Sequence, residues 1–242
     1  MRETAVDMTK IAEIISSDRS QYLAYIGLSI GVLGLTGILY YSDALLFQRF
    51  IGEINPLIAF FIVAVLGVGL FTILLYRGWF AIYQKRYLFR YSGLAVLFVI
   101  ASILVDLKVG FPADINIPFP KSLAFYPAIG FLVEIIFHVL PLTILLVSLT
   151  AIFKKISYAN ILWTCILIVA LLEPVFQVMS MVGSNHFPIW ALAIVWVNIF
   201  IFNLAQLLIF RRYDFISMYS FRLVYYLVWH IVWGSIRLLI LL

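Results

Sequence analysis

Seven long, uninterrupted apolar stretches constrain the fold of this chain more than any other feature. A helix needs about 20 apolar residues to cross the roughly 30 Å hydrocarbon core of a bilayer. The stretches are continuous and do not alternate with polar residues, which argues against strands. We therefore predict an all-α, polytopic membrane helix bundle of about seven transmembrane helices, over residues 22–41, 57–76, 92–108, 125–152, 158–180, 189–210 and 216–240.

Composition supports a membrane class and excludes several others. The 242 residues are 65% hydrophobic and 11% charged, whereas soluble domains are about 25% charged. The net charge of +5 does not indicate nucleic-acid binding, because the basic residues form short clusters between apolar stretches. The single cysteine, Cys165, excludes an intramolecular disulfide and a cysteine-rich metal site.

The distribution of Lys and Arg predicts the orientation, since cytoplasmic loops are enriched in both. With the N-terminus in the cytoplasm, the outer segments hold four basic residues, namely Arg49, Lys108, Lys121 and Arg237. The inner segments hold eleven: Arg2, Lys10, Arg19, Arg77, Lys85, Arg86, Arg90, Lys154, Lys155, Arg211 and Arg212. We predict a cytoplasmic N-terminus and a C-terminus on the far side, in the cell membrane of a prokaryote.

The chain divides into a polar segment and one membrane domain. Residues 1–21 are polar and of mixed charge, without the features of a cleavable signal peptide, and are expected to be cytoplasmic. Residues 22–242 form a single transmembrane domain without an internal repeat. Within it, 42–56 mixes aromatic and charged residues as an interfacial helix does. The proline-containing stretch 109–124 is predicted to be an irregular loop.

Four ionisable side chains lie deep within the predicted spans: Glu134, His138, Glu173 and His230. A charged group near the bilayer centre costs about 2.5–3.5 kcal/mol, so such residues face the bundle interior and find partners. At about 1.5 Å of rise per residue, all four lie within about 6 Å of the mid-plane, with Asn198 at a similar depth. The predicted site is therefore one polar layer built from three helices.

Helical spacing and prolines reinforce this layer. Glu134 and His138 are four residues apart and share one helix face, as do Glu173 and Gln177. Pro141 and Pro174 lie close by, and each proline frees a backbone carbonyl that must be satisfied inside the membrane. The prolines therefore predict a polar cavity beside the carboxylates.

Two chemistries fit this set of residue types. Glu134, His138, Glu173 and His230 could be the ligands of a divalent metal such as zinc, which would generate a nucleophilic hydroxide. Without metal, a Glu–His pair could act as a general base on water. We take all four as candidate catalytic and metal-binding residues. Alternatively, the pair only holds helices together.

The other polar residues are interpreted as solvent-exposed, packing or interfacial residues. His186 lies in a loop and is expected to be exposed to solvent. Asn203 and Gln206 are expected to serve helix packing. Arg222 lies near the inner end of the last span, where its side chain is expected to snorkel towards the interface.

The stretch 127–237 resembles the CAAX-protease and bacteriocin-processing group of intramembrane metalloproteases. The surroundings of Glu134 and His138 resemble the first motif of that group, those of Glu173 the second, and those of His230 the third. Only Glu134 and His230 match the motif residues themselves. Val133 replaces a glutamate, and the remaining departures are His138 for Arg, Glu173 for Phe, Gln177 for His and Gly234 for Asn.

The resemblance implies a metal-dependent hydrolase that cleaves a membrane-embedded or lipidated peptide. Two alternatives stay open. The chain could be a catalytically inactive relative that binds a partner membrane protein or serves as a scaffold, or a membrane metalloenzyme acting on a lipid or isoprenoid. A structure that brings Glu134, His138, Glu173 and His230 within bonding distance of one point would favour a metal site.

Overall fold

A computed structural model describes residues 18–84, 91–112, 115–181 and 188–240 of the chain. These residues form helices and connecting turns, without strands. The long elements are α2 (Arg19–Ser42), α4 (Pro56–Tyr76), α5 (Ala95–Val109), α6 (Ser122–Val133), α7 (Leu140–Ile152), α8 (Tyr158–Met181), α9 (Ile189–Arg212) and α10 (Phe215–Tyr226). Two π-helical segments, η4 (Glu134–Val139) and η5 (Leu227–Trp233), continue α6 into α7 and α10 into the terminal helix α11 (Gly234–Ile240).

The predicted all-α membrane bundle is confirmed. Among the described residues, six helical stretches are long and apolar enough to cross a membrane. The seventh, α5, overlaps predicted span 92–108 but has only 15 residues. At 1.5 Å per residue it is about 22 Å long, shorter than the hydrocarbon core. The chain is therefore an integral, multi-pass membrane protein, whose described residues contain six full-length spans and the shorter helix α5.

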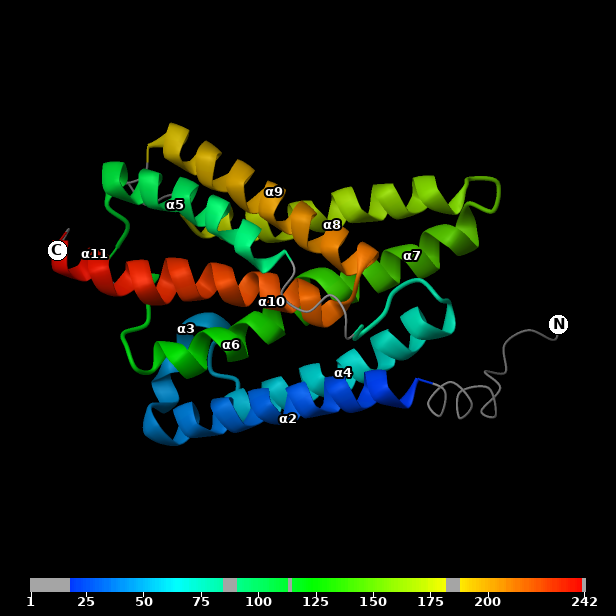
Figure 1. Cartoon of the computed structure of the whole chain (residues 1–242), viewed down its shortest axis with the longest axis horizontal. Coiled ribbons are helices and arrows are strands. Elements are labelled where there is room, and N and C mark those ends of the chain that lie inside the picture. The colour runs from blue at the N-terminus through cyan, green and yellow to red at the C-terminus, as the bar shows by residue number, and fades with distance from the viewer. Residues whose placement is uncertain (1–17, 85–90, 113–114, 182–187, 241–242) are drawn as a thin grey trace.

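Two continuous helical rods form the centre of the bundle. Figure 1 shows α2 and α4 along one side and α5, α8 and α9 towards the other. Between them run α6–η4–α7 and α10–η5–α11, which pack against each other. Because both rods contact helices on the two sides, their inward side chains are buried most deeply.

The connection between α2 and α4 agrees in part with the interfacial helix predicted over residues 42–56. The predicted interfacial helix becomes two short turns, η1 (Ala44–Phe47) and α3 (Gln48–Ile51). Phe47 is fully buried and packs its ring against Phe60 and Phe125, so this segment covers the bundle end. Beside it, the ammonium of Lys121 donates to Asp43 at 2.7 Å and lowers the pKa of that carboxyl.

A set of hydrogen bonds to the backbone fixes the start of α10 at the opposite end of the bundle. Asp214 precedes α10, and its carboxylate accepts from the N–H groups of Ser217 at 2.6 Å and Gln84 at 2.8 Å. Phe215 N–H donates to the Ala81 carbonyl at 3.0 Å, and Ile216 N–H donates to that of Ile82 at 3.1 Å. These bonds satisfy the free N–H groups of the helix start.

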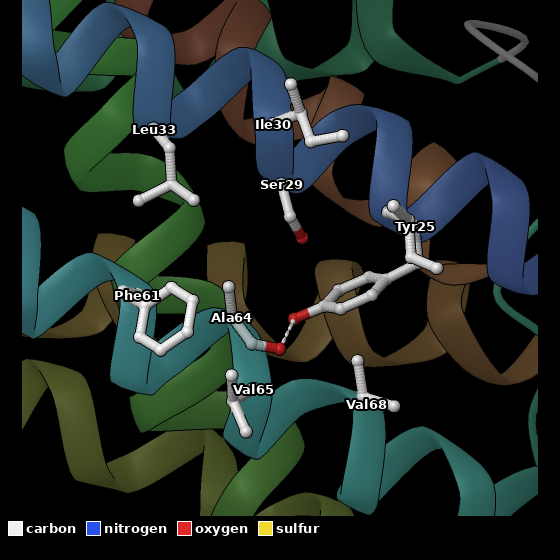
Figure 2. A pocket seen from close by; sticks show the side chains of 9 residues that line it. Tyr25, Ser29, Ile30, Leu33, Phe61, Ala64, Val65 and Val68 are labelled. Atoms are coloured by element: carbon white, nitrogen blue, oxygen red, sulfur yellow. Dashed lines mark hydrogen bonds between the residues drawn. The ribbon is translucent and has the colours of Figure 1, made fainter.

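A small groove lies between α2 and α4. Figure 2 shows its lining, where the hydroxyl of Tyr25 donates to the Ala64 carbonyl at 3.1 Å. The cavity volume is about 160 Å³. Gly67 allows the ring of Tyr25 to lie against α4, because a Cβ at Gly67 would collide with the tyrosine hydroxyl.

Candidate functional site

The π-helical segment η4 presents the first pair of site residues. It begins at Glu134, includes His138, and is followed by Pro141, which lacks the N–H that a helix interior uses. Both side chains are completely buried, and His138 Nδ1 lies 3.0 Å from Glu134 Oε2. π-Helical turns inside α-helices occur frequently at functional sites.

Arg222 of α10 joins two carboxylates that come from different helices. Its Nε donates to Glu134 Oε1 at 2.5 Å. Its two terminal nitrogens donate to the two oxygens of Glu173 on α8, at 3.0 and 2.8 Å. All three residues are at most 3% exposed. The expectation that Arg222 snorkels to the interface is therefore wrong, because its guanidinium neutralises carboxylates inside the bundle.

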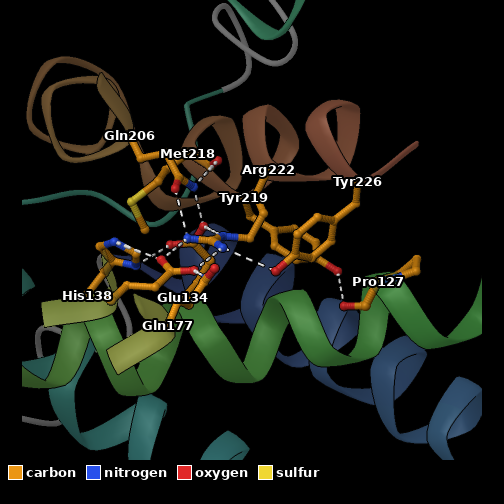
Figure 3. Close-up of polar contacts among 10 residues, drawn as sticks. Pro127, Glu134, His138, Gln177, Gln206, Met218, Tyr219, Arg222 and Tyr226 are labelled. Atoms are coloured by element: carbon orange, nitrogen blue, oxygen red, sulfur yellow. Dashed lines mark hydrogen bonds and ion pairs between the residues drawn. The ribbon is translucent and has the colours of Figure 1, made fainter. Parts of the chain in front are cut away.

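Three neutral side chains add hydrogen bonds to this cluster, as Figure 3 shows in part. Gln206 of α9 donates to Glu134 Oε1 and accepts from Arg222 at 2.9 Å. Gln177 donates to Glu173 at 2.8 Å, and the Tyr226 hydroxyl accepts from Arg222 at 3.2 Å. Gln206 thus binds the charged groups, beyond the packing role expected of it.

One side of the cluster is left incomplete. Glu134 Oε2 and His138 Nδ1 face each other at 3.0 Å, and His138 Nε2 is buried without a hydrogen-bond partner among the described residues. His138 Nε2 lies 3.9 Å from Glu173 Oε2. An unpaired buried polar group costs about 1–3 kcal/mol. Such groups in proteins indicate a catalytic role or a bound water or ion.

The charges of the cluster show how it handles a proton. Two carboxylates and one guanidinium leave one excess negative charge while His138 is neutral. Protonation of His138 balances that charge, with Glu134 and Glu173 on two sides of the ring. The arrangement thus places an imidazole, a group that can accept and donate protons, against two carboxylates.

The fourth predicted residue, His230, belongs to a different contact set. It lies on η5, four residues beyond Tyr226, and is partly exposed. Its Nδ1 lies 2.8 Å from Asn116 Oδ1, and its ring stacks on Tyr126 with centroids 4.4 Å apart. The structure brings Glu134, His138 and Glu173 together and leaves His230 outside their ion pairs.

Asn198, predicted beside the polar layer, and Asn203, expected to serve helix packing, do not join the cluster. Asn198 donates to the Phe98 carbonyl and to Ser102 Oγ of α5, both at 3.1 Å, so it ties α9 to α5. Asn203 is fully buried, and its amide finds no partner in the described part of the chain. His186 lies outside the described residues.

The donor set does not fit a resident metal ion. Among residues 18–84, 91–112, 115–181 and 188–240, no three His, Cys, Asp or Glu side chains are arranged to hold one. Arg222 occupies the position between Glu134 and Glu173 with its own positive charge. Metal binding by Glu134, His138, Glu173 and His230 stays a prediction, to be tested by metal analysis.

Sequence reasoning missed a second buried ion pair. Asp106 and Arg237 are both fully buried, with Arg237 Nε donating to Asp106 Oδ2 at 2.7 Å. Asp106 also accepts from Trp233 Nε1 at 2.7 Å and from the Phe111 N–H at 2.8 Å. Arg237 was counted among outer-loop residues. The available signal was its location, because an arginine among the apolar residues of the last helix needs a carboxylate partner.

The fold and cluster define the class as a polytopic helical membrane protein with a buried Glu–Arg–Glu–His network. Comparisons with protein-family models, with curated proteins and with solved structures found no match to the chain. The resemblance to the CAAX-protease and bacteriocin-processing group therefore rests on the motifs around Glu134, Glu173 and His230. It stays a prediction.

Proposed function

We propose that this protein is an intramembrane hydrolase in which Glu134 and His138 activate a water molecule. The observation that carries the proposal is the incomplete side of the cluster. His138 Nδ1 lies 3.0 Å from Glu134 Oε2, whereas His138 Nε2 is buried without a hydrogen-bond partner among the described residues. A water molecule in hydrogen-bond contact with Nε2 would be polarised by this acceptor, which Glu134 orients from the other side of the ring.

The chemistry follows from the neighbours of His138. The pair removes a proton from water as its oxygen attacks the carbonyl carbon of the scissile bond. His138 holds that proton beside Glu134 and Glu173, and then donates it to the leaving nitrogen as the carbon–nitrogen bond breaks. Arg222 keeps both carboxylates ionised and in position by its charge and hydrogen bonds. It is a positioning residue in this scheme.

The depth of the cluster supports a substrate that reaches the site from the membrane. Glu134 and His138 lie in the middle of the 31-residue membrane-crossing stretch Ser122–Ile152. A membrane-embedded or lipidated peptide, the substrate class implied by the resemblance, would meet this requirement. We propose the cell membrane of a prokaryote as the location of the protein, and the Lys and Arg distribution supports a cytoplasmic N-terminus.

The test compares membranes of cells that produce wild-type protein with those that produce Glu134→Gln or His138→Gln. New peptide termini in the membrane fraction are identified by mass spectrometry. The proposal expects termini that depend on the wild type and vanish with either variant. Asn198→Gln is the matched control, because it changes a partly buried amide outside the cluster. Identical termini in all membranes, with every protein folded, would refute a hydrolase.

Metal content of the purified protein is a separate measurement. The proposed chemistry expects less than stoichiometric zinc, and activity that survives chelator treatment. One zinc per chain, lost in His138→Gln, would replace the metal-free scheme by the metalloprotease that the resemblance implies.

A scaffold is the second candidate, and the bonding of Arg222 favours it. Arg222 links α6–η4, α8, α9 and α10 through Glu134, Glu173 and Gln206. Such a network could serve only to lock four helices. If the protein is a scaffold, His138→Gln leaves the set of membrane peptides unchanged and still restores function in cells that lack the wild-type protein.

A further inference from the structure

An aromatic and cationic cluster lies at the basic end of the bundle, separate from the buried site. In Figure 1 the end of α4 and the α7–α8 turn lie at the same end of the bundle. Arg77 follows α4, and its guanidinium lies over Trp79 at 5.6 Å from the ring centroid. Trp79 stacks on Tyr158, the first residue of α8, with centroids 5.8 Å apart and planes at 22°.

A second arginine joins this cluster from α9. Arg211 lies over the ring of Trp163 on α8, 5.1 Å from its centroid, and within electrostatic reach of Tyr158. Ring contacts thus join Arg77, Trp79 and Tyr158 in one group and Arg211 and Trp163 in another, and the charge of Arg211 acts on Tyr158. Both arginines are exposed and each rests on an indole face. We call these five residues the inner aromatic cluster.

The positive charge of the cluster is not compensated within the described chain. Arg77 and Arg211 form no ion pair with a described carboxylate, and the same holds for Lys154, Lys155 and Arg212 nearby. Two described acidic residues at this end bind other groups, since Asp214 caps α10 and Asp18 accepts from Gln21 at 2.8 Å. The cluster therefore presents excess positive charge at the membrane boundary.

The chemistry of the cluster matches one kind of ligand. A guanidinium stacked on a ring keeps its edge free, and that planar edge binds phosphate oxygens through two parallel hydrogen bonds. Trp and Tyr at the ends of spans lie at the headgroup level of a bilayer. Basic sites between transmembrane helices on the cytoplasmic side bind anionic headgroups. The hydroxyl of Tyr158 is without a hydrogen bond in the described chain and adds a donor.

We propose that the inner aromatic cluster binds the phosphate headgroup of an anionic phospholipid from the leaflet at this end. Arg77 and Arg211 bind the phosphate oxygens, while Trp79 and Trp163 hold the two guanidinium groups in place. The lipid would connect α4, α8 and α9 at their basic ends. This site does not depend on the hydrolase chemistry proposed for Glu134 and His138.

The experiment measures lipid binding to the purified full-length protein by native mass spectrometry. Phosphatidylglycerol and phosphatidylcholine with identical acyl chains are offered in equal amounts. Wild type is expected to retain phosphatidylglycerol preferentially. The double variant Arg77→Gln with Arg211→Gln should lower its affinity by about thirtyfold, since each basic residue near an anionic surface contributes about fivefold.

The matched control removes the same charge from the same end. Lys154→Gln with Arg212→Gln changes two exposed cations that are not stacked on the cluster, and should lower affinity by less than about fivefold, because charges that do not contact the phosphate are screened by salt. Equal losses in the two double variants would overturn a defined site in favour of a diffuse charge effect. No preference for phosphatidylglycerol in wild type would also overturn it.

Two further arms separate the remaining explanations. Inorganic phosphate at millimolar concentration should leave the bound phosphatidylglycerol in place, and displacement would assign the site to a soluble anion instead. Trp79→Leu with Trp163→Leu keeps both charges but removes the ring faces, and should weaken lipid binding while the thermal midpoint stays within a few degrees. Unchanged lipid binding in this variant would refute the role of the rings.

Discussion

Replacing Arg222 by methionine is the most direct perturbation of the buried network. The change removes the guanidinium that bonds Glu134, Glu173, Gln206 and Tyr226, and leaves two carboxylates without a counter-charge. Breaking a buried ion pair by removing one partner costs about 3–5 kcal/mol. In a domain of this size each kcal/mol lowers the thermal midpoint by about 2–4 °C. The expected drop is therefore about 6–20 °C.

The chain supplies its own probe for this measurement. Cys165 is the only cysteine and is completely buried on α8, so a thiol-reactive dye reports its exposure on heating in detergent micelles. Arg212→Met, at an exposed position, is the matched control and should leave the midpoint within about 1 °C. Glu134→Gln with Glu173→Gln, added to Arg222→Met, should restore most of the loss, because neutral amides need no counter-charge.

A thermal midpoint of Arg222→Met within 2 °C of wild type would refute the role of Arg222 in charge compensation. A triple variant no more stable than Arg222→Met would refute it as well, since the loss of stability would then reflect packing of the arginine side chain. Lower stability that is rescued by neutralising the carboxylates would show that charge compensation is the role of Arg222.

Two other substitutions probe different parts of the bundle by the same melting assay. Asp106→Asn leaves Arg237 buried without a counter-charge and should lower the free energy of unfolding by about 3–5 kcal/mol. Asp43→Asn changes an exposed pair and should not shift the thermal midpoint measurably. Equal midpoints for both variants would contradict the first expectation. Gly67→Ala should lower the free energy of unfolding by about 1–3 kcal/mol, because its Cβ would collide with the hydroxyl of Tyr25. Adding Tyr25→Phe should recover part of that loss. A Gly67→Ala variant as stable as wild type would show that α2 and α4 separate freely.

Much of the fold followed from local sequence, and the residue types of the candidate site did as well. Glu134 and His138 were paired correctly, because four residues of helix place two side chains on one face whatever surrounds them. Their contact with Glu173 agreed with the depth estimate, which needs only the ends of each span. His230 and Asn198 have similar depths but face other neighbours, so a shared depth did not bring them into the cluster.

The partners of the buried charges could not be read in the same way. Arg222 lies 88 residues from Glu134 and 49 from Glu173, and Arg237 lies 131 from Asp106. Which charges meet depends on how each helix is rotated about its axis. A helix such as α4, which is apolar all round, carries little sequence information about that rotation.

The sequence by itself therefore determined that this protein crosses the membrane repeatedly as helices, and that a few ionisable groups lie within it. The transfer of each residue into hydrocarbon is a local property, which accumulates along one helix. Only the tertiary structure decided that Arg222 lies between two carboxylates and that His138 Nε2 has no hydrogen-bond partner among the described residues. Those contacts arise from packing among four helices, where rotation and depth together select each partner.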